Sequence, residues 1–169
     1  RIIPVGKWII QNAFSMCTEC RKYYPEFRVS INLSYVQILK SPLMMELKQI
    51  IEHSGISCSG IIVELTESGY LEGTPAVRSV WNDMKKLRIQ IALDDFGTGY
   101  SNLMNISNLE PDIVKLDRGF TLKALSRSYE YQLMQYVIEM VHKLNQYVCV
   151  EGVETKEDLE KIKALGPCL

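Results

Sequence analysis

Acidic and amide side chains recur at the ends of five short apolar segments of this 169-residue sequence. A carboxylate at the end of a buried strand is costly unless it is paired or bound to a metal ion, so several together predict cations. Oxygen donors without histidine or cysteine favour Mg²⁺ or Mn²⁺, and two such ions suit phosphodiester hydrolysis. The residues in question are Asn32, Glu64 and Glu67, Asp94 and Asp95, Lys115 and Asp117, and Glu151 and Glu154.

Each of these residues also has an ordinary structural explanation. A lone asparagine or carboxylate often caps a turn or helix, an acidic residue in the first turn of a helix is favoured by the helix dipole, and a lysine can be a structural ion-pair partner. The argument for a site is that all five segments are expected to deliver polar groups to the same end. The two histidines, His53 and His142, fall in expected helices away from that end.

The segments that carry these residues read as strands separated by helices. Apolar runs without helical spacing predict strands, and runs with apolar residues every three or four positions predict helices. This alternation predicts a parallel sheet covered by helices, either part of a (βα)8 barrel or a doubly wound open sheet, for which the Gly-rich first turn is missing. The expected strands are 28–32, 61–65, 90–93, 113–116 and 147–150, and the main helices are 4–24, 74–86, 128–144 and 156–165, with a short helix near 102–108.

The first expected helix carries a Cys17-Thr18-Glu19-Cys20 segment that could suggest zinc or redox chemistry. A tetrahedral zinc site needs further ligands, and no partner pair exists. We therefore assign Cys17 and Cys20 to an apolar helix face that also includes Val5, Trp8, Ile9 and Ala13. Five cysteines without regular spacing argue against a disulfide framework and favour a reducing, cytoplasmic setting.

Composition excludes two classes of partner. The formal net charge is −1, so binding to polymeric nucleic acid has no electrostatic support. No apolar run approaches the roughly 20 residues of a membrane span. We expect a cytoplasmic domain, or the cytoplasmic part of a larger membrane-anchored signalling protein.

Five motifs resemble those of a known family, the EAL domains. They are SINLS at 30–34, ELTES at 64–68, DDFGTGYS at 94–101, KLD at 115–117 and EGVET at 151–155. They occur in order along essentially the whole chain, so we interpret residues 1–169 as a single partial EAL domain. The resemblance implies a modified (βα)8 barrel that cuts cyclic di-GMP to linear pGpG with Mg²⁺ or Mn²⁺, with two ions per site.

The resemblance also implies a role for each matching residue. Asn32, Glu64 and Asp94 would hold the first metal, and Asp94 would bridge to a second that is also held by Asp95 and Glu151. Lys115 would orient the attacking water, and Glu151 would help to activate it. Support of the ligand-binding end and of the loop after Asp95, which in this family leads to a homodimer interface, would come from Glu67, Asp117, Glu154, Gly97, Thr98 and Gly99.

The sequence departs from the family at both ends. The Glu-Ala-Leu motif of the first strand and the final strand are absent, so we expect an incomplete barrel and no activity from this chain alone. Two other functions remain open. A catalytically inactive EAL receptor would bind cyclic di-GMP without turnover, and an unrelated Mg²⁺-dependent barrel enzyme would not respond to it.

Overall fold

The computed structural model of the chain describes residues 2–40, 42–66, 75–98, 106 and 109–167. The chain divides into two compact units, Arg1–Ile91 and Ala92–Leu169. The described strands are ordered β1-β2-β3-β4-β5, and the pairs β1–β2, β3–β4 and β4–β5 are parallel. The predicted α/β class with a parallel sheet is therefore confirmed. None of the described helices is long and apolar enough to cross a membrane.

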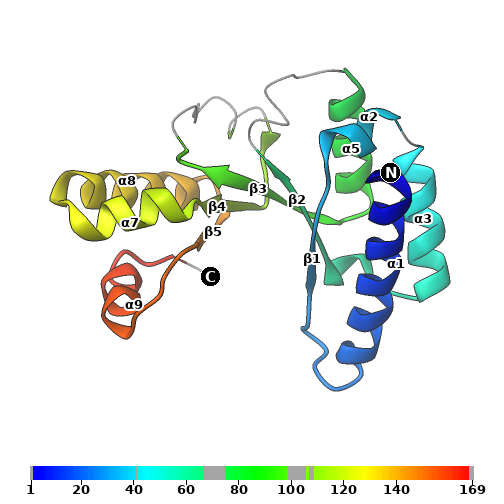
Figure 1. Ribbon diagram of the computed structural model, residues 1–169, viewed down its shortest axis with the longest axis horizontal. Coiled ribbons are helices and arrows are strands. Elements are labelled where there is room, and N and C mark those ends of the chain that lie inside the picture. The colour runs from blue at the N-terminus through cyan, green and yellow to red at the C-terminus, as the bar shows by residue number, and fades with distance from the viewer. Residues whose placement is uncertain (1, 41, 67–74, 99–105, 107–108, 168–169) are drawn as a thin grey trace. The chain divides into compact units, whose positions relative to one another are not determined.

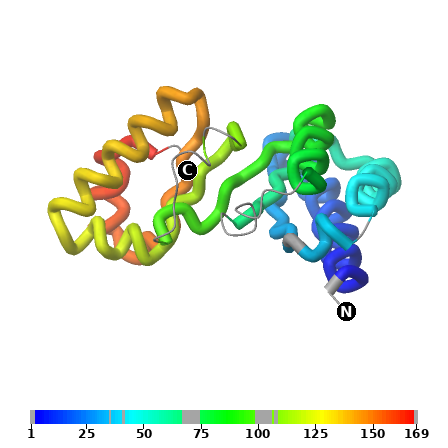
Figure 2. Tube along the Cα trace, turned by 90° about the horizontal axis from the view of Figure 1, so that it is seen from above, coloured from blue at the N-terminus to red at the C-terminus, as the bar shows by residue number. Residues whose placement is uncertain are grey.

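The first unit contains helices that pack against one another and against a strand pair (Figure 1). Within it, α1 lies beside α3, and α5 contacts both α2 and α3 (Figure 2). The strand β3 begins in this unit. Its elements are α1 (Ile2–Arg21), β1 (Val29–Asn32), α2 (Tyr35–Lys40), α3 (Leu43–Ser54), the 3-10 turn η1 (Cys58–Gly60), β2 (Ile61–Thr66) and α5 (Pro75–Lys86).

The helix α1 packs through a face that overlaps only in part with the one predicted from the sequence, since Cys17 belongs to both. Ile10, Phe14 and Cys17 are buried, whereas Trp8 is 64% exposed and Ile9 49%. Two sets of apolar residues on this helix satisfy a three-to-four-residue spacing, so periodicity does not identify which one faces the core. The burial of Cys17 among core side chains agrees with its assignment to an apolar face rather than a metal site. The helix ends at Arg21 instead of the predicted residue 24.

The second unit places two antiparallel helices beside a parallel strand pair, with a short helix at its end (Figure 1). One of these helices, α7, was not predicted: it covers Arg118–Ser126, where the sequence has no clear apolar period. The expected helix near 102–108 lies almost entirely outside the described residues. The unit contains most of β3 (Gln90–Phe96), β4 (Ile113–Leu116), α7, α8 (Ser128–Lys143), β5 (Tyr147–Val150) and α9 (Lys156–Lys163).

Candidate active site

A bulge in β3 sets the geometry of the two adjacent aspartates. Leu93 is paired with Val114, and Phe96 with Leu116. Between these two pairs β3 therefore contains one residue more than β4. The extra residue belongs to the Asp94–Asp95 pair, and Asp95 adopts a left-handed backbone conformation with φ of 59°. A bulge re-aims side chains that would otherwise alternate between the faces of a strand. Both carboxylates can therefore lie near Lys115, their neighbour on β4.

Lys115 connects two strand ends through ion pairs. Its Nζ lies 3.0 Å from Oδ1 of Asp94 and 2.8 Å from Oε1 of Glu151. The side chains of Lys115 and Asp94 are 14% and 13% exposed, and that of Glu151 is 37% exposed. Because β3, β4 and β5 are parallel neighbours, their carboxyl ends meet, and the three charges converge as the sequence predicted.

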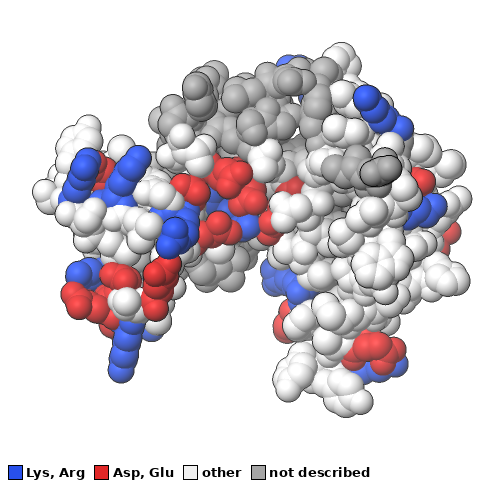
Figure 3. Space-filling view, viewed as in Figure 1, with Lys and Arg blue, Asp and Glu red and all other residues white. Residues whose placement is uncertain are grey.

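The charges around Asp95 are predominantly negative. Partial desolvation raises the pKa of Asp95, the negative charges of Asp94, Asp117 and Glu151 raise it further, and Lys115 acts in the opposite direction. Asp95 is thus influenced by three other carboxylates and by one ammonium group. Acidic side chains gather, with basic atoms among them, over the region where Figure 1 draws β3, β4 and β5 (Figure 3). Such an excess of negative charge favours the binding of cations.

Asp117 has a structural role beside the site. Its Oδ1 accepts hydrogen bonds from the backbone N–H groups of Gly119, at 2.7 Å, and Phe120, at 3.3 Å, so it caps α7. Gly97 lies close to the same helix, because a Cβ there would stand 2.9 Å from the ring of Phe120. Its φ of 105° also requires glycine. These two residues therefore join the end of β3 to the start of α7.

In the first unit, Asn32, the last residue of β1, is the register partner of Glu64, which lies two residues before the end of β2. Glu64 is 8% exposed, and its Oε1 accepts a hydrogen bond from Ser30 Oγ at 2.5 Å. Asn32 is exposed. Two oxygen-bearing residues thus stand on neighbouring strands, and Ser30, which had no role in the sequence-based prediction, orients the buried carboxylate through its hydrogen bond.

The remaining predicted residues are distributed differently. Glu67 and Gly99 lie outside the described residues, as does most of the expected dimer loop. Thr98 is exposed at the end of β3. Glu154 is paired with Arg118, whose Nη2 lies 2.6 Å from its Oε1. The sequence analysis assigned no role to Arg118, although this residue directly follows the KLD motif.

The side chains fit a divalent metal by their chemistry. Oδ1 of Asp94 is buried and forms no hydrogen bond of good geometry, although the Lys115 ammonium lies 3.0 Å away, so it retains capacity for a cation. Within the described part of the chain, no three His, Cys, Asp or Glu side chains already converge as a metal-binding group. Metal binding through Asp94 and Asp95 would therefore require additional ligands or a rearrangement of Lys115.

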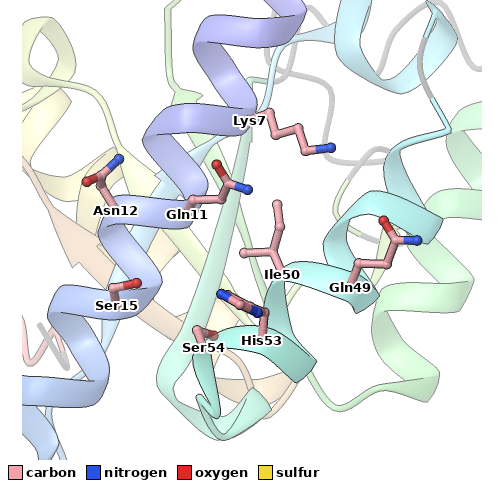
Figure 4. Close-up of a pocket in the computed structure, with 8 residues that line it drawn as sticks. All are labelled: Lys7, Gln11, Asn12, Ser15, Gln49, Ile50, His53 and Ser54. Atoms are coloured by element: carbon pink, nitrogen blue, oxygen red, sulfur yellow. The ribbon is translucent and has the colours of Figure 1, made fainter.

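A pocket of about 540 Å³ between α1 and α3 is a second candidate site (Figure 4). All of its lining residues come from helices, and none is a carboxylate; they are Lys7, Gln11, Asn12, Ser15, Gln49, Ile50, His53 and Ser54. This donor set lacks the hard anionic ligands that Mg²⁺ prefers. By donor chemistry, a divalent metal ion therefore fits the strand ends better than this pocket.

Comparison with known protein families assigns the chain to one of them. The model of the EAL domain matches residues 1–168. The chain belongs to the EAL domain family. The membership agrees with the five motifs and with the parallel sheet whose strand ends carry them.

Individual relatives of this EAL domain are moderately similar. It is 33% identical over 158 residues to the cyclic di-GMP phosphodiesterase PdeR of Escherichia coli, covering 93% of this chain and 24% of PdeR. It spans about a fifth to a quarter of the length of the first curated relatives it matches.

Solved structures give the same picture. The EAL enzyme Bd1971, bound to cAMP and cyclic di-GMP, superimposes with a TM-score of 0.90 at 27% identity, covering 98% of this chain and 46% of that one. The PaMucR phosphodiesterase in complex with cyclic di-GMP superimposes with a TM-score of 0.88 at 26% identity, covering 98% and 68%. The barrel-like fold predicted from the motifs is therefore confirmed at the level of the family.

Proposed function

We propose that this EAL domain forms the catalytic core of a phosphodiesterase that hydrolyses cyclic di-GMP to linear pGpG with divalent metal ions. The observation that supports this most directly is the convergence of Asp94, Lys115 and Glu151 at the ends of three parallel strands. The similarity of this chain to the cyclic di-GMP phosphodiesterase PdeR and to the cyclic di-GMP complex of PaMucR supports the same substrate for this protein.

The proposed metal ligands are oxygen donors at strand ends. Asn32 and Glu64, register partners on β1 and β2, would hold one ion. Asp94, Asp95 and Glu151 would hold a second. When bound, Mg²⁺ or Mn²⁺ would neutralise phosphate charge and lower the pKa of a bound water. The buried and incompletely satisfied Oδ1 of Asp94 supports its proposed role as a metal ligand.

Lys115 and Glu151 would act on the water. Ion pairs with two carboxylates hold the Lys115 ammonium group in position, so Lys115 could orient a water molecule towards the phosphorus. Glu151 would accept a proton from that water as its oxygen bonds to phosphorus. The bond from phosphorus to the 3′ oxygen of one ribose then breaks, and that oxygen takes up a proton from solvent, while Glu151 returns its accepted proton to solvent. This opens the ring and leaves a 5′ phosphate.

Assembly and location are further parts of this proposal. Homodimer formation would use the loop after Asp95. A cytoplasmic location is supported by the free cysteines Cys17, Cys20, Cys58 and Cys149. Homodimer formation is tested by measuring the oligomeric state in solution with and without cyclic di-GMP.

The function is tested by measuring conversion of cyclic di-GMP to pGpG by the intact protein, with Mg²⁺ or Mn²⁺ and with EDTA, beside Glu151→Gln. We expect turnover that requires metal and falls by about 1,000-fold in the variant, because a proton acceptor and a metal ligand are lost together. An exposed substitution on α8, Glu139→Gln, is the matched control and should retain activity.

The outcomes separate the candidate functions. Binding of cyclic di-GMP without turnover would contradict the hydrolase and favour the receptor. Absence of both binding and turnover in a folded protein would contradict both functions that depend on cyclic di-GMP.

A further inference from the structure

Arg118 connects the strand end that carries Lys115 to the segment that follows β5. It is the first residue of α7, directly after the cap residue Asp117, and its side chain is 60% exposed. Its Nη2 and Nε lie 2.6 and 3.3 Å from the same oxygen, Oε1 of Glu154. The partners are 36 residues apart in sequence, so this ion pair joins the start of α7 to the segment after β5.

A second close approach joins Arg118 to the same segment. Gly152, with φ of 78°, lies so near that a Cβ there would overlap Cγ of Arg118 and would stand 2.9 Å from its Cβ and 3.0 Å from its Cα. The last of these atoms belongs to the backbone, which cannot move aside as a flexible side chain can. The segment after β5 therefore rests directly on the start of α7, and glycine is needed both for its conformation and for this approach.

The segment 151–154 depends on such interactions for its position. It belongs to no helix or strand, and α9 begins only at Lys156. At one end the N–H of Glu151 donates to the carbonyl of Leu116 at 3.1 Å, and the Glu151 carboxylate meets Lys115. At the other end Glu154 meets Arg118. Arg118 and the end of β4 thus hold both ends of a four-residue turn.

We propose that Arg118 is a positioning residue for Glu151. It fixes the turn through Glu154 and Gly152, and so holds the Glu151 carboxylate against Lys115. This inference rests on the proposed phosphodiester hydrolysis for its effect on rate, but its structural part can be measured without substrate. An exposed ion pair contributes little to stability by itself, so its effect should appear in the placement of Glu151 and not in the melting temperature.

The test compares Arg118→Ala, Arg118→Lys and the matched control Arg127→Ala in the intact protein. Arg127, an arginine of similar exposure, pairs with Glu130 at 3.1 Å. It lies at the start of α8 and not beside the segment 151–154 in sequence. We expect kcat to fall about ten-fold in Arg118→Ala, because a small displacement of a reacting group is costly, with KM changed less than about two-fold. Arg118→Lys should recover part of kcat, and Arg127→Ala should match the wild type.

Hydrogen–deuterium exchange of the peptide covering 147–155 gives a readout that does not need turnover. We expect exchange about ten-fold faster in Arg118→Ala, with the melting temperature and the other peptides unchanged, and no change in Arg127→Ala. Glu154→Gln should reproduce both effects, and combining it with Arg118→Ala should add nothing further.

Unchanged exchange in Arg118→Ala would overturn the inference. So would a raised KM with unchanged kcat, because the guanidinium would then act by binding substrate. If the wild type had no turnover, the proposed function would fail, and exchange alone would decide the role of Arg118: faster exchange would support it and unchanged exchange would overturn it.

Discussion

Lys115 Nζ lies 2.8 Å from Oε1 of Glu151, and the two residues come from neighbouring parallel strand ends. The same ammonium group lies 3.0 Å from Asp94. A charge shared in this way offsets the repulsion between carboxylates that would otherwise be partly buried together. Lys115 can therefore have two roles: a structural counter-ion, and a group that orients water during hydrolysis.

We predict that Lys115→Met destabilises the metal-free protein by about 2 kcal/mol, because removing one partner of a buried pair leaves charge without compensation. Added Mn²⁺ should recover more stability in this variant than in the wild type, since cations would replace the lost ammonium group. Turnover should fall by about 100-fold or more even with metal. Chemical denaturation with and without EDTA measures the first two effects.

The control for this prediction is Arg127→Met, which removes an exposed cation of the same unit. Its free energy of unfolding should change by less than about 1 kcal/mol, and Mn²⁺ should have the wild-type effect. Equal responses of the two variants to Mn²⁺ would show that Lys115 does not compensate charge at the metal-binding end.

Asp95→Asn is predicted to stabilise the metal-free protein while abolishing metal-dependent turnover. Burial and the neighbouring carboxylates raise the pKa of Asp95 in the fold. A raised folded pKa means that its stabilising contribution is complete below the unfolded pKa of the side chain and is lost as the pH rises through the folded value. At neutral pH the charged form is therefore unfavourable, and its removal should raise the unfolding free energy, by less than about 1 kcal/mol because Asp95 is exposed and solvent screens its charge.

This prediction is checked by urea unfolding between pH 4 and 8 in EDTA. The gain from Asp95→Asn should grow as the pH rises, whereas Asp83→Asn, which removes a carboxylate paired with Lys86 at 2.9 Å, should show no such growth. A gain that is constant with pH would contradict the assigned electrostatics.

The sequence predicts the convergence of the site better than its detailed geometry. The carboxyl ends of parallel strands must meet, so Asp94, Lys115 and Glu151 could be brought together from their places after apolar runs alone. The bulge that re-aims Asp95 could not be foreseen, since it depends on the register of two strands. The same holds for Arg118 and Glu154, because an ion pair across 36 residues leaves no local pattern.

The sequence also did not predict which face of α1 is buried or that α7 forms a helix. α1 carries two apolar stripes, and only tertiary packing selects the one with Phe14 and Cys17 as buried. α7 has almost no apolar asymmetry, but its first turn is fixed by the Asp117 cap. Because Asp117 belongs to the KLD motif and was expected to support the site, its role as the cap of α7 was not recognised from the sequence.

Cys17 is predicted to be the least reactive of the described cysteines. It is fully buried, and burial is the largest cause that raises its thiol pKa, opposed by the positive charge of Arg21. Its Sγ lies 3.7 Å from the carbonyl oxygen of Gly60. Iodoacetamide labelling of the native protein at pH 8, read by mass spectrometry, should modify Cys17 about 100-fold more slowly than the partly exposed Cys20.

The same raised pKa gives a pH dependence. The folded state holds the Cys17 proton more tightly than the unfolded state, so this contribution to stability is lost as the pH rises above the ordinary thiol range. Cys17→Ala should reduce the loss of stability between pH 8 and 10, although the cavity costs about 1 kcal/mol throughout. Similar labelling rates for Cys17 and Cys20 in the native protein would contradict the burial of Cys17.

Gly152→Ala is predicted to damage the site more than an equivalent change at Gly166. Both glycines have positive φ, 78° and 74°, so alanine is strained at either position, at a cost of about 1 kcal/mol. Only at Gly152 would the new Cβ meet another backbone, at Cα of Arg118; nothing lies within 4 Å of one at Gly166. Gly152→Ala should therefore lose about 2 to 3 kcal/mol of stability.

Gly152→Ala should also lose turnover beyond that explained by unfolding, because Glu151 shifts away from Lys115. Thermal unfolding and turnover below the melting transition measure the two effects separately, and equal losses in both variants would show that the close approach to Arg118 has no influence on the site.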